Sequence, residues 1–269
     1  MIRRSVNKSK LARELGVSRA SLYYKPKREE MDQEVKRQIE SVMVEHLDYG
    51  HKRIAIHLKI GHNRIRRIMK KYGLKPYRRR AKQLVKKKDQ KKPKTSYENL
   101  IQPLLKDNLI VRCGQVWCTD FTYIKFQGKF IYVATIIDLY NREIVGVNIS
   151  RYHNRFLVLG ALEDALKTHE PSEIIHSDQG SEYDSVDFTQ FVTMIESKLS
   201  MSEKGSPWQN GHQESFYGHF KTEAGDVNRF EQLGELIEFI YQQVYYYNHK
   251  RIHSILKMSP VDFRKRHDV

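Results

Sequence analysis

The sequence predicts a mixed α/β layer sandwich preceded by a smaller all-α region that carries most of the positive charge. Apolar residues repeat at helical spacing up to about residue 110 and alternate at strand spacing after it. Three strand patterns then follow one another before helices and short strands alternate, which is typical of a mixed sheet covered by helices. The first 100 residues hold 30 basic and 10 acidic residues (+20), whereas the remaining 169 hold 18 and 22 (−4).

The composition excludes several classes of protein. No apolar stretch follows the charges of residues 1–8, so we expect no secretory signal. The longest apolar run, residues 130–137, is far shorter than the ~18 residues that a membrane span needs. Cys113 and Cys118 are the only cysteines, too few for a disulfide framework or a four-cysteine zinc site. We therefore expect a cytoplasmic protein without membrane contact, whose basic half binds a polyanion.

The first 25 residues are interpreted as a short helical hairpin. Gly16 can end the first helix with a positive φ, and Ser18 can cap a second helix over residues 19–24. This pattern is typical of a helix-turn-helix, whose second helix enters the major groove. A plain amphipathic hairpin with solvated arginines explains it equally well. The predicted DNA contacts at the front of the second helix are Arg19 and Ser21.

A second helical group is expected over residues 34–47, 52–59 and 64–72, with Asn63 as the cap of the last helix and Gly73 at its end. A solvated helix face normally mixes charges of both signs, yet no acidic residue interrupts residues 64–80. We therefore favour a DNA-facing surface over an ordinary charged helix face. Its predicted DNA contacts are Arg64, Arg67, Lys70 and Lys71. The Lys-rich run that follows repels itself, stays extended and marks a linker.

After the linker, the alternation predicts three antiparallel strands over residues 116–124, 130–137 and 144–149. A helix over residues 155–168, a strand over 174–176, a helix over 186–195 and a strand over 198–202 complete the expected sandwich.

Three acidic residues stand out by their placement. Asp120 lies in mid-strand, where Asp is disfavoured, and Asp178 directly follows a buried strand, where α/β folds place ligands. Glu214 lies near the start of a helix. Carboxylates without thiols favour Mg²⁺ or Mn²⁺ over zinc, and two such ions can serve phosphodiester chemistry. Asp138 is the rival first ligand, but it ends a strand before a turn, so an Asx turn is the favoured interpretation there.

The sequence around these acids is specific. The motifs are Trp117-Cys-Thr-Asp-Phe-Thr-Tyr-Ile, His176-Ser-Asp-Gln-Gly-Ser-Glu-Tyr, Asn210-Gly-His-Gln-Glu-Ser-Phe and, in the tail, Tyr247-Asn-His-Lys-Arg-Ile-His-Ser. They resemble the DDE transposases of bacterial insertion sequences, and most of all their integrase-like second-frame proteins, over nearly the whole chain. Gly211 stands where these proteins often have Ala, and Gln179 where Arg is also common.

The resemblance implies a ribonuclease H-like core shared with retroviral integrases. Asp120, Asp178 and Glu214 would be the catalytic and metal-binding residues, holding two Mg²⁺ or Mn²⁺ ions for strand cleavage and transfer. Asn210 resembles the family position that approaches the DNA end. Lys221, seven residues after Glu214 on one helix face, would reach a phosphate beside the metals; the alternative is a surface pair with Glu223 or Asp226.

The expected organisation is a helical helix-turn-helix DNA-binding region over residues 1–80, a basic linker over 81–108, a catalytic core over 109–228 and a C-terminal helical extension over 229–269. The expected partners are double-stranded DNA, both terminal inverted repeats and target, and further copies of the chain on that DNA, in the bacterial nucleoid.

Two rival functions are kept beside the transposase. One is a non-catalytic DNA-binding regulator derived from such an element, against which the presence of all three acids argues. The other is a metal-dependent nuclease of the same fold. Because hydrolysis and strand joining need the same ligands, the residues alone do not separate them.

Overall fold

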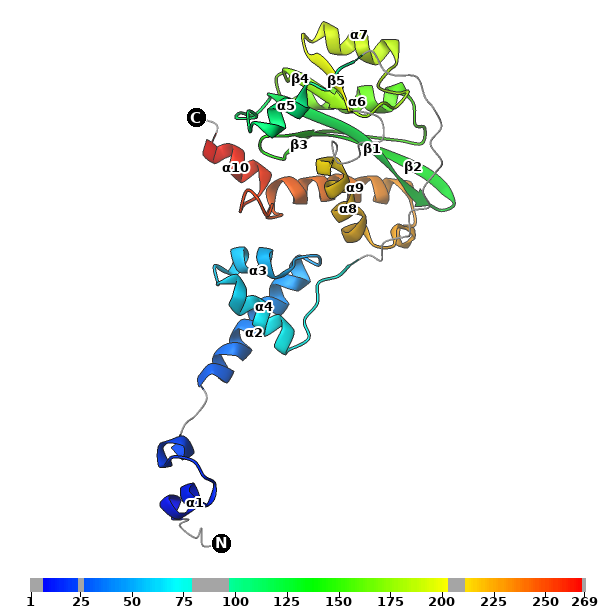
Figure 1. Cartoon of the computed structure of the whole chain (residues 1–269). Coiled ribbons are helices and arrows are strands. Elements are labelled where there is room, and N and C mark those ends of the chain that lie inside the picture. Colours follow the sequence, from blue (N-terminus) through cyan, green and yellow to red (C-terminus); the bar gives the residue numbers. More distant parts are fainter. Residues whose placement is uncertain (1–6, 24–26, 79–96, 203–210, 268–269) are drawn as a thin grey trace, which may run out of the picture.

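The structure is a computed structural model of the 269-residue chain, and it describes residues 7–23, 27–78, 97–202 and 211–267. A five-stranded sheet with helices on both faces forms the larger part, and a group of three helices lies beside it (Figure 1). None of the described helices is long and apolar enough to cross a bilayer.

The sheet has the strand order β3-β2-β1-β4-β5. Strands β1, β2 and β3 pair antiparallel, whereas β4 and β5 are added parallel to β1, which confirms the mixed α/β class. Gln127 and Gly128, both with positive φ, form the two-residue turn between β1 and β2, as suits the twist of a hairpin. The bounds are Val116–Phe126, Lys129–Asp138, Ile144–Ser150, Ile174–Ser177 and Lys198–Met201 for β1 to β5.

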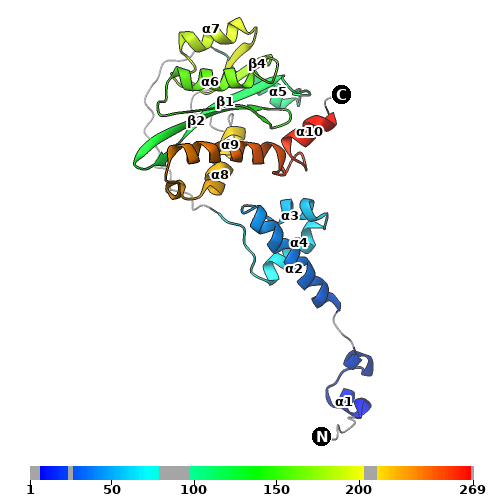
Figure 2. The same cartoon turned by 180° about the vertical axis from the view of Figure 1, so that it is seen from behind.

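Helices cover both faces of the sheet (Figures 1 and 2). On one face, α6 (Arg155–Ala165) and α7 (Val186–Met194) pack over a core that includes Trp117 and Ile136. On the other face, α8 (Gly211–Ala224) and α9 (Leu233–His249) pack over a second core that includes Val133. The sheet is therefore buried on both sides, which explains the near-continuous apolar run of β2.

Two short helices complete the larger part. Helix α5 (Ile101–Lys106) lies inside the range expected as linker, and Ile101 packs against Val116 and Cys118 of β1. Helix α10 (Pro260–His267) packs against α9 near the end of the chain.

The three-helix group consists of α2 (Lys27–Glu45), α3 (His51–Leu58) and α4 (His62–Lys71) around a fully buried isoleucine core. Helix α2 begins seven residues before the predicted start. Helix α4 follows Gly61 with no side-chain cap, so the prediction of Asn63 as its cap was wrong. Gly73 has a φ of 68° and follows the end of α4, as predicted.

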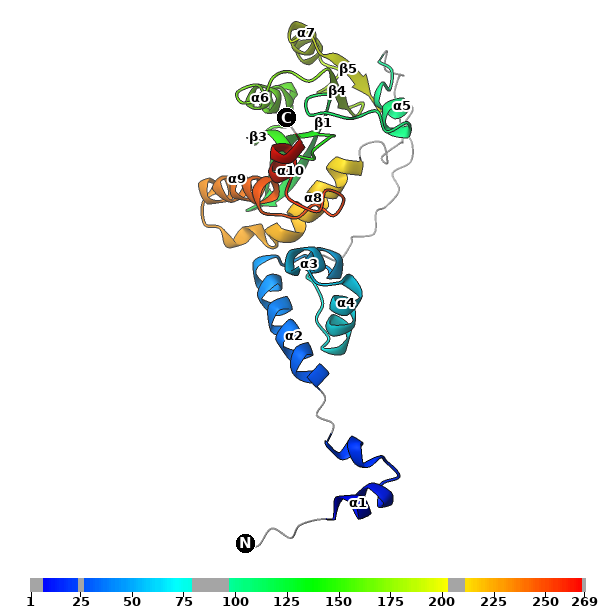
Figure 3. The same cartoon turned by 90° about the vertical axis from the view of Figure 1, so that its left-hand side faces the viewer.

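The N-terminal unit consists of α1 (Lys8–Glu14) and η1, a 3₁₀ helix over Arg19–Tyr23. Gly16 has a φ of 64° and the Ser18 hydroxyl accepts the Ser21 N–H at 3.2 Å, both as expected. The second element is nevertheless a 3₁₀ helix where an α-helix was predicted. The unit lies at the opposite end of the molecule from the sheet in all three views (Figure 3).

The three-helix group contacts the larger part through buried polar residues. Arg251, just after α9, donates two hydrogen bonds of 2.6 and 2.8 Å to Asp48, just after α2, and one of 3.0 Å to Glu223. Asp48 also pairs with His219 of α8 at 2.7 Å, and the Tyr49 hydroxyl accepts the backbone N–H of Ile252. These contacts place α2 and α3 beneath the α8–α9 side of the sheet (Figure 3).

Candidate active site

Asp120 lies within β1, and Asp178 directly follows β4, the parallel strand beside it. Strand β1 pairs with β4 so that Cys118 stands opposite His176, and each aspartate lies two residues further on. Asp178 accepts the N–H of Gly180 at 3.0 Å in a local turn, and Asp120 accepts the N–H of Phe121 at 2.8 Å. Asp120 is half-buried and Asp178 is exposed. The carboxyl end of β4, beside which Asp120 lies, is the kind of place where ligands bind in α/β folds.

Two buried side chains of α8 hold Glu214 near Asp120. The Gln213 amide donates to the Cys118 carbonyl at 2.7 Å, and the Tyr217 hydroxyl donates to the Asp120 carbonyl at 2.7 Å. Sequence reasoning missed both residues. Their four-residue spacing on one helix face was the available signal, but it is shared by any buried helix face.

The three carboxylates influence one another electrostatically. Burial, together with the charges of Asp178 and Glu214, raises the pKa of Asp120 to about 7, while the Phe121 N–H and Lys221 oppose the shift. The Lys221 ammonium lies 5.3 Å from the centre of the Tyr123 ring of β1. Asp178, Glu214 and Lys221 therefore all lie near enough to Asp120 for their charges to influence its pKa.

The donor set suits a hard divalent cation. Burial raises the pKa of the Cys118 thiol well above its ordinary value, so this thiol is not an available soft ligand. A nearby cation would stabilise the charged forms of the three carboxylates, including Asp120, whose pKa is raised without it. Within the described part of the chain, no three His, Cys, Asp or Glu side chains stand close enough together to hold a metal ion as they are. Binding would therefore have to draw the acids together.

Asp138 has a structural role, as expected. Its carboxylate accepts the N–H groups of Gly114 at 2.6 Å, Tyr140 at 2.8 Å and Asn141 at 3.4 Å. These bonds tie the end of β2 to the start of β1, so the favoured Asx-turn interpretation is confirmed.

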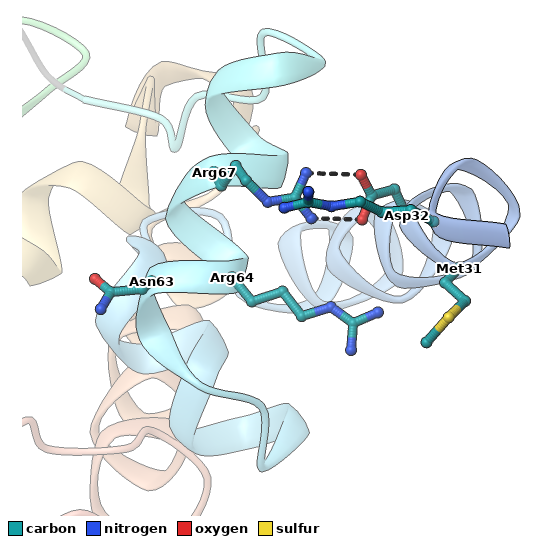
Figure 4. Close-up of a pocket in the computed structure, with 6 residues that line it drawn as sticks. Met31, Asp32, Asn63, Arg64 and Arg67 are labelled. Carbon is teal, nitrogen blue, oxygen red and sulfur yellow. Dashed lines mark hydrogen bonds and ion pairs between the residues drawn. The ribbon is translucent and has the colours of Figure 1, made fainter. Parts of the chain in front are cut away.

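The basic face of α4 is partly neutralised by α2 (Figure 4). Arg67 forms a two-pronged ion pair with Asp32 at 2.6 and 2.7 Å, while Arg64 lies beside this pair without such a partner in the view. Lys71 pairs with Glu29 and, at 3.4 Å, with Asp32. The counter-charges come from 35 or more residues away, which explains why the run around α4 looked purely basic.

The other predicted DNA contacts fall in three places. Arg19 and Ser21 lie exposed in η1, where the Ser21 hydroxyl bonds to that of Ser18 at 2.8 Å. Lys70 is exposed at the end of α4. Asn210 lies outside the described residues.

The chain is similar to known proteins along most of its length. Residues 111–207 match the family described as Integrase core domain, and residues 196–260 match a second family with the same description. The chain is 32% identical over 258 residues to a transposase for insertion sequence element IS904 of Lactococcus lactis, which covers 91% of this chain and 99% of that protein. It is 27% identical over 269 residues to a putative transposase for IS150 of Escherichia coli, covering 95% and 93%.

A solved structure of a simian T-cell lymphotropic virus intasome, in complex with a PP2A regulatory subunit, is also similar. It has a TM-score of 0.49 and 12% identity, and it covers 84% of this chain and 73% of that chain.

Proposed function

Because this chain belongs to the insertion-sequence transposases with an integrase core domain, we propose that Asp120, Asp178 and Glu214 are its catalytic residues for cutting and joining DNA at the ends of an insertion sequence. The arrangement of the strands carries this proposal, because the parallel pairing of β1 and β4 brings Asp120 beside the carboxyl end of β4, which Asp178 directly follows. The charges of Asp178 and Glu214, which contribute to the raised pKa of Asp120, support it further.

Two Mg²⁺ or Mn²⁺ ions held by these carboxylates would activate an attacking oxygen and stabilise a leaving one at a phosphodiester. The chain's own contribution is the position of the three acids, which β1, β4 and the Gln213 and Tyr217 hydrogen bonds of α8 maintain. Lys221 is the proposed contact to a DNA phosphate at this site.

Helices α3 and α4 are the better-formed DNA-reading unit. Three residues separate them, with Gly61 just before α4, which is the connection typical of a helix-turn-helix. The proposed phosphate or base contacts of α4 are Arg64 and Lys70, with Arg67 and Lys71 more engaged in pairing. Arg19 and Ser21 of η1, and Asn210, are proposed as additional contacts.

The proposed organisation keeps the four expected regions, with residues 1–80 binding the terminal inverted repeats and 109–228 performing the chemistry. Two element ends must be joined in one event, so the active form would be a homo-oligomer on DNA.

A strand-transfer assay with the full chain, Mg²⁺ and labelled element-end duplex tests the catalytic role. Asp120→Asn, Asp178→Asn and Glu214→Gln are each expected to abolish cleaved and joined products while duplex binding persists. Asp184→Asn, an exposed aspartate six residues after Asp178, is the matched control and should keep wild-type activity. A near-wild-type rate for any of the three variants would remove that residue from the site. Cleaved products without joined ones would identify a nuclease instead.

A further inference from the structure

A largely enclosed cavity of about 170 Å³ lies between the sheet, α8, α3 and the segment that follows α9. Its lining is strongly basic. Among the described residues that line it are three arginines and three histidines, and none is acidic: Arg53, Arg142, Arg251, His212, His219 and His253. The cavity belongs to the back of α8, since His212, Ser215 and His219 are on a different face of that helix from Glu214.

Two of the residues that line the cavity have buried polar atoms with no hydrogen-bond partner in the described part of the chain. These atoms are the Nε and Nη1 of Arg142 and the Nδ1 of His253. A buried guanidinium nitrogen without an acceptor is costly, because burial removes its water without replacing it. Both groups come from segments far apart in sequence, so their convergence on one cavity is a property of the fold.

No nearby carboxylate that the structure describes is hydrogen-bonded to the Nε or Nη1 atom of Arg142. Asp48 and Glu223 bond to Arg251 from outside the cavity, and Asp48 also pairs with His219 and, at 3.9 Å, with Arg53. Glu143, the acid next to Arg142 in sequence, accepts from Asn141 at 2.9 Å and pairs with Arg264 at 3.3 Å. Asp138 accepts backbone N–H groups at the end of β2, and only its charge acts on Arg142.

The His253 imidazole is influenced by the same positive charges. Burial, together with the charges of Arg142 and Arg53, lowers the pKa of His253 to about 4. A buried imidazole that neighbouring guanidinium groups help to keep neutral favours the approach of an anion.

We propose that this cavity is a binding site for one tetrahedral oxyanion of the phosphate class, with the Arg142 guanidinium as its principal ligand and His253 and Ser215 beside it. Its volume exceeds the ~30 Å³ share of one water, yet lies below the ~300 Å³ at which small-molecule pockets begin. A phosphate group fits, whereas a nucleoside does not. The ligand is either free phosphate or the terminal phosphate of a DNA strand. The site is separate from the proposed catalytic acids and does not depend on their role.

Thermal unfolding of the full chain in phosphate, compared with chloride at equal ionic strength, tests the proposal. Phosphate is expected to raise the melting temperature of the wild type and of Arg151→Gln, an exposed arginine used as the matched control. The phosphate affinity of Arg142→Gln should fall roughly tenfold or more, because a charge-assisted hydrogen bond is lost. An equal effect of chloride and phosphate on the wild type, or an undiminished phosphate effect in Arg142→Gln, would overturn the proposal.

A second variant and a second measurement separate ligand loss from misfolding. Arg142 has a φ of 66°, a conformation that glycine adopts without strain. Arg142→Gly should therefore keep the backbone turn while removing the guanidinium that would bind phosphate. Proton NMR of wild-type protein should show the pKa of His253 rising when inorganic phosphate is added. An unchanged pKa of His253 would contradict the site.

A DNA duplex with a 5′-phosphate identifies the source of the phosphate. If this duplex changes the pKa of His253 and its 5′-hydroxyl counterpart does not, the ligand is a DNA terminus. If only inorganic phosphate changes it, the ligand is the free ion.

Discussion

Gln213 and Tyr217 determine where Glu214 stands relative to Asp120. Both are buried, and their polar ends bond to backbone carbonyls of β1 and to Thr135 of β2. A buried carbonyl or hydroxyl that loses its partner costs about 1–3 kcal/mol. These bonds therefore hold α8 against the sheet and determine the spacing of the carboxylates as well as the stability of the fold.

Tyr217→Phe tests this positioning role. The variant should lose about 1–3 kcal/mol of unfolding free energy, because the Asp120 carbonyl is left without its donor. It should also need more Mg²⁺ for half-maximal strand transfer, while duplex binding stays the same. Tyr241→Phe, at an exposed position on α9, is the control and should change neither quantity. A destabilised variant with an unchanged Mg²⁺ requirement would show that Tyr217 is only structural.

The acids could be predicted from the sequence because their signal is local. Asp120 is a residue type that is disfavoured in the middle of a strand, and Asp178 directly follows a strand. Each is therefore unusual among its immediate neighbours. Gln213 could not be predicted, because its partners Cys118 and Thr135 lie 95 and 78 residues away. When the role of a polar side chain depends on backbone groups far away in the sequence, the residues around it do not indicate that role.

Ion pairing divides the basic residues of α4 into two kinds. Arg67 is bonded to Asp32, which is buried, whereas Arg64 projects beside that pair into the shallow pocket between α2 and α4 (Figure 4). The paired arginine holds the two helices together. Arg64 and the exposed Lys70 are better placed for phosphate.

Single substitutions on α4 should separate these roles. Arg64→Gln and Lys70→Gln should each weaken duplex binding and flatten its salt dependence, since each phosphate contact releases a counterion. Their melting temperatures should equal that of the wild type. Arg67→Gln should lower the melting temperature, because Asp32 is then buried without its partner. Binding titrations at two salt concentrations and thermal melts measure both effects; an unchanged melting temperature in Arg67→Gln would contradict the division.

The same ion pair predicts an acid-dependent stability. Hydrogen bonds from the Arg67 guanidinium hold the pKa of Asp32 well below its ordinary value of 3.8. The unfolded state then binds more protons than the native state below that value, so the contribution of Asp32 is present above it and is lost as the pH falls. Urea unfolding between about pH 3 and pH 6 measures this contribution. As the pH falls, the unfolding free energy of Arg67→Gln should decrease less than that of the wild type. Equal slopes would mean that Arg67 does not hold this pKa down.

Periodic elements were predictable, and elements without an apolar pattern were not. The alternation of β1 and the apolar density of β2 place those strands to within two residues at each end. The first turns of α2 are rich in charge and offer no apolar period, so the helix begins earlier than its pattern indicates. At η1 a Ser cap is present, but a helix needs more than a start signal to extend in the α form.

At the scale of the whole molecule, the basic three-helix group and the weakly acidic core are connected through a buried charge cluster. Asp48 and Arg251 lie 203 residues apart, and each exposes about 3% or less of its side chain. The sequence predicts two parts with different tasks from charge alone, but it contains no local sign of how they dock, because each partner looks like an ordinary surface residue in its own segment.

Asp48→Asn should therefore weaken the docking of the two parts. Removing one partner of a buried ion pair costs about 3–5 kcal/mol, because Arg251 keeps its charge without its main acceptor. Asp184→Asn, at an exposed position, should cost nothing measurable. Urea unfolding of the full chain measures both, and a loss in Asp48→Asn no larger than in this control would mean that the cluster does not stabilise the assembly.

The unfolding free energy should depend on pH, because Asp48 and Glu223 of the buried charge cluster have pKa values shifted in opposite directions. Hydrogen bonds from His219 and Arg251 outweigh burial and hold the pKa of Asp48 below its ordinary 3.8, so its contribution is present above that pH and is lost as the pH falls. Burial raises the pKa of Glu223, so the native state binds more protons than the unfolded state above 4.5, and the contribution of Glu223 falls as the pH rises. In Asp48→Asn the unfolding free energy should decrease less as the pH falls, because residue 48 no longer titrates. An acid-side slope equal to that of the wild type would assign the loss to other carboxylates.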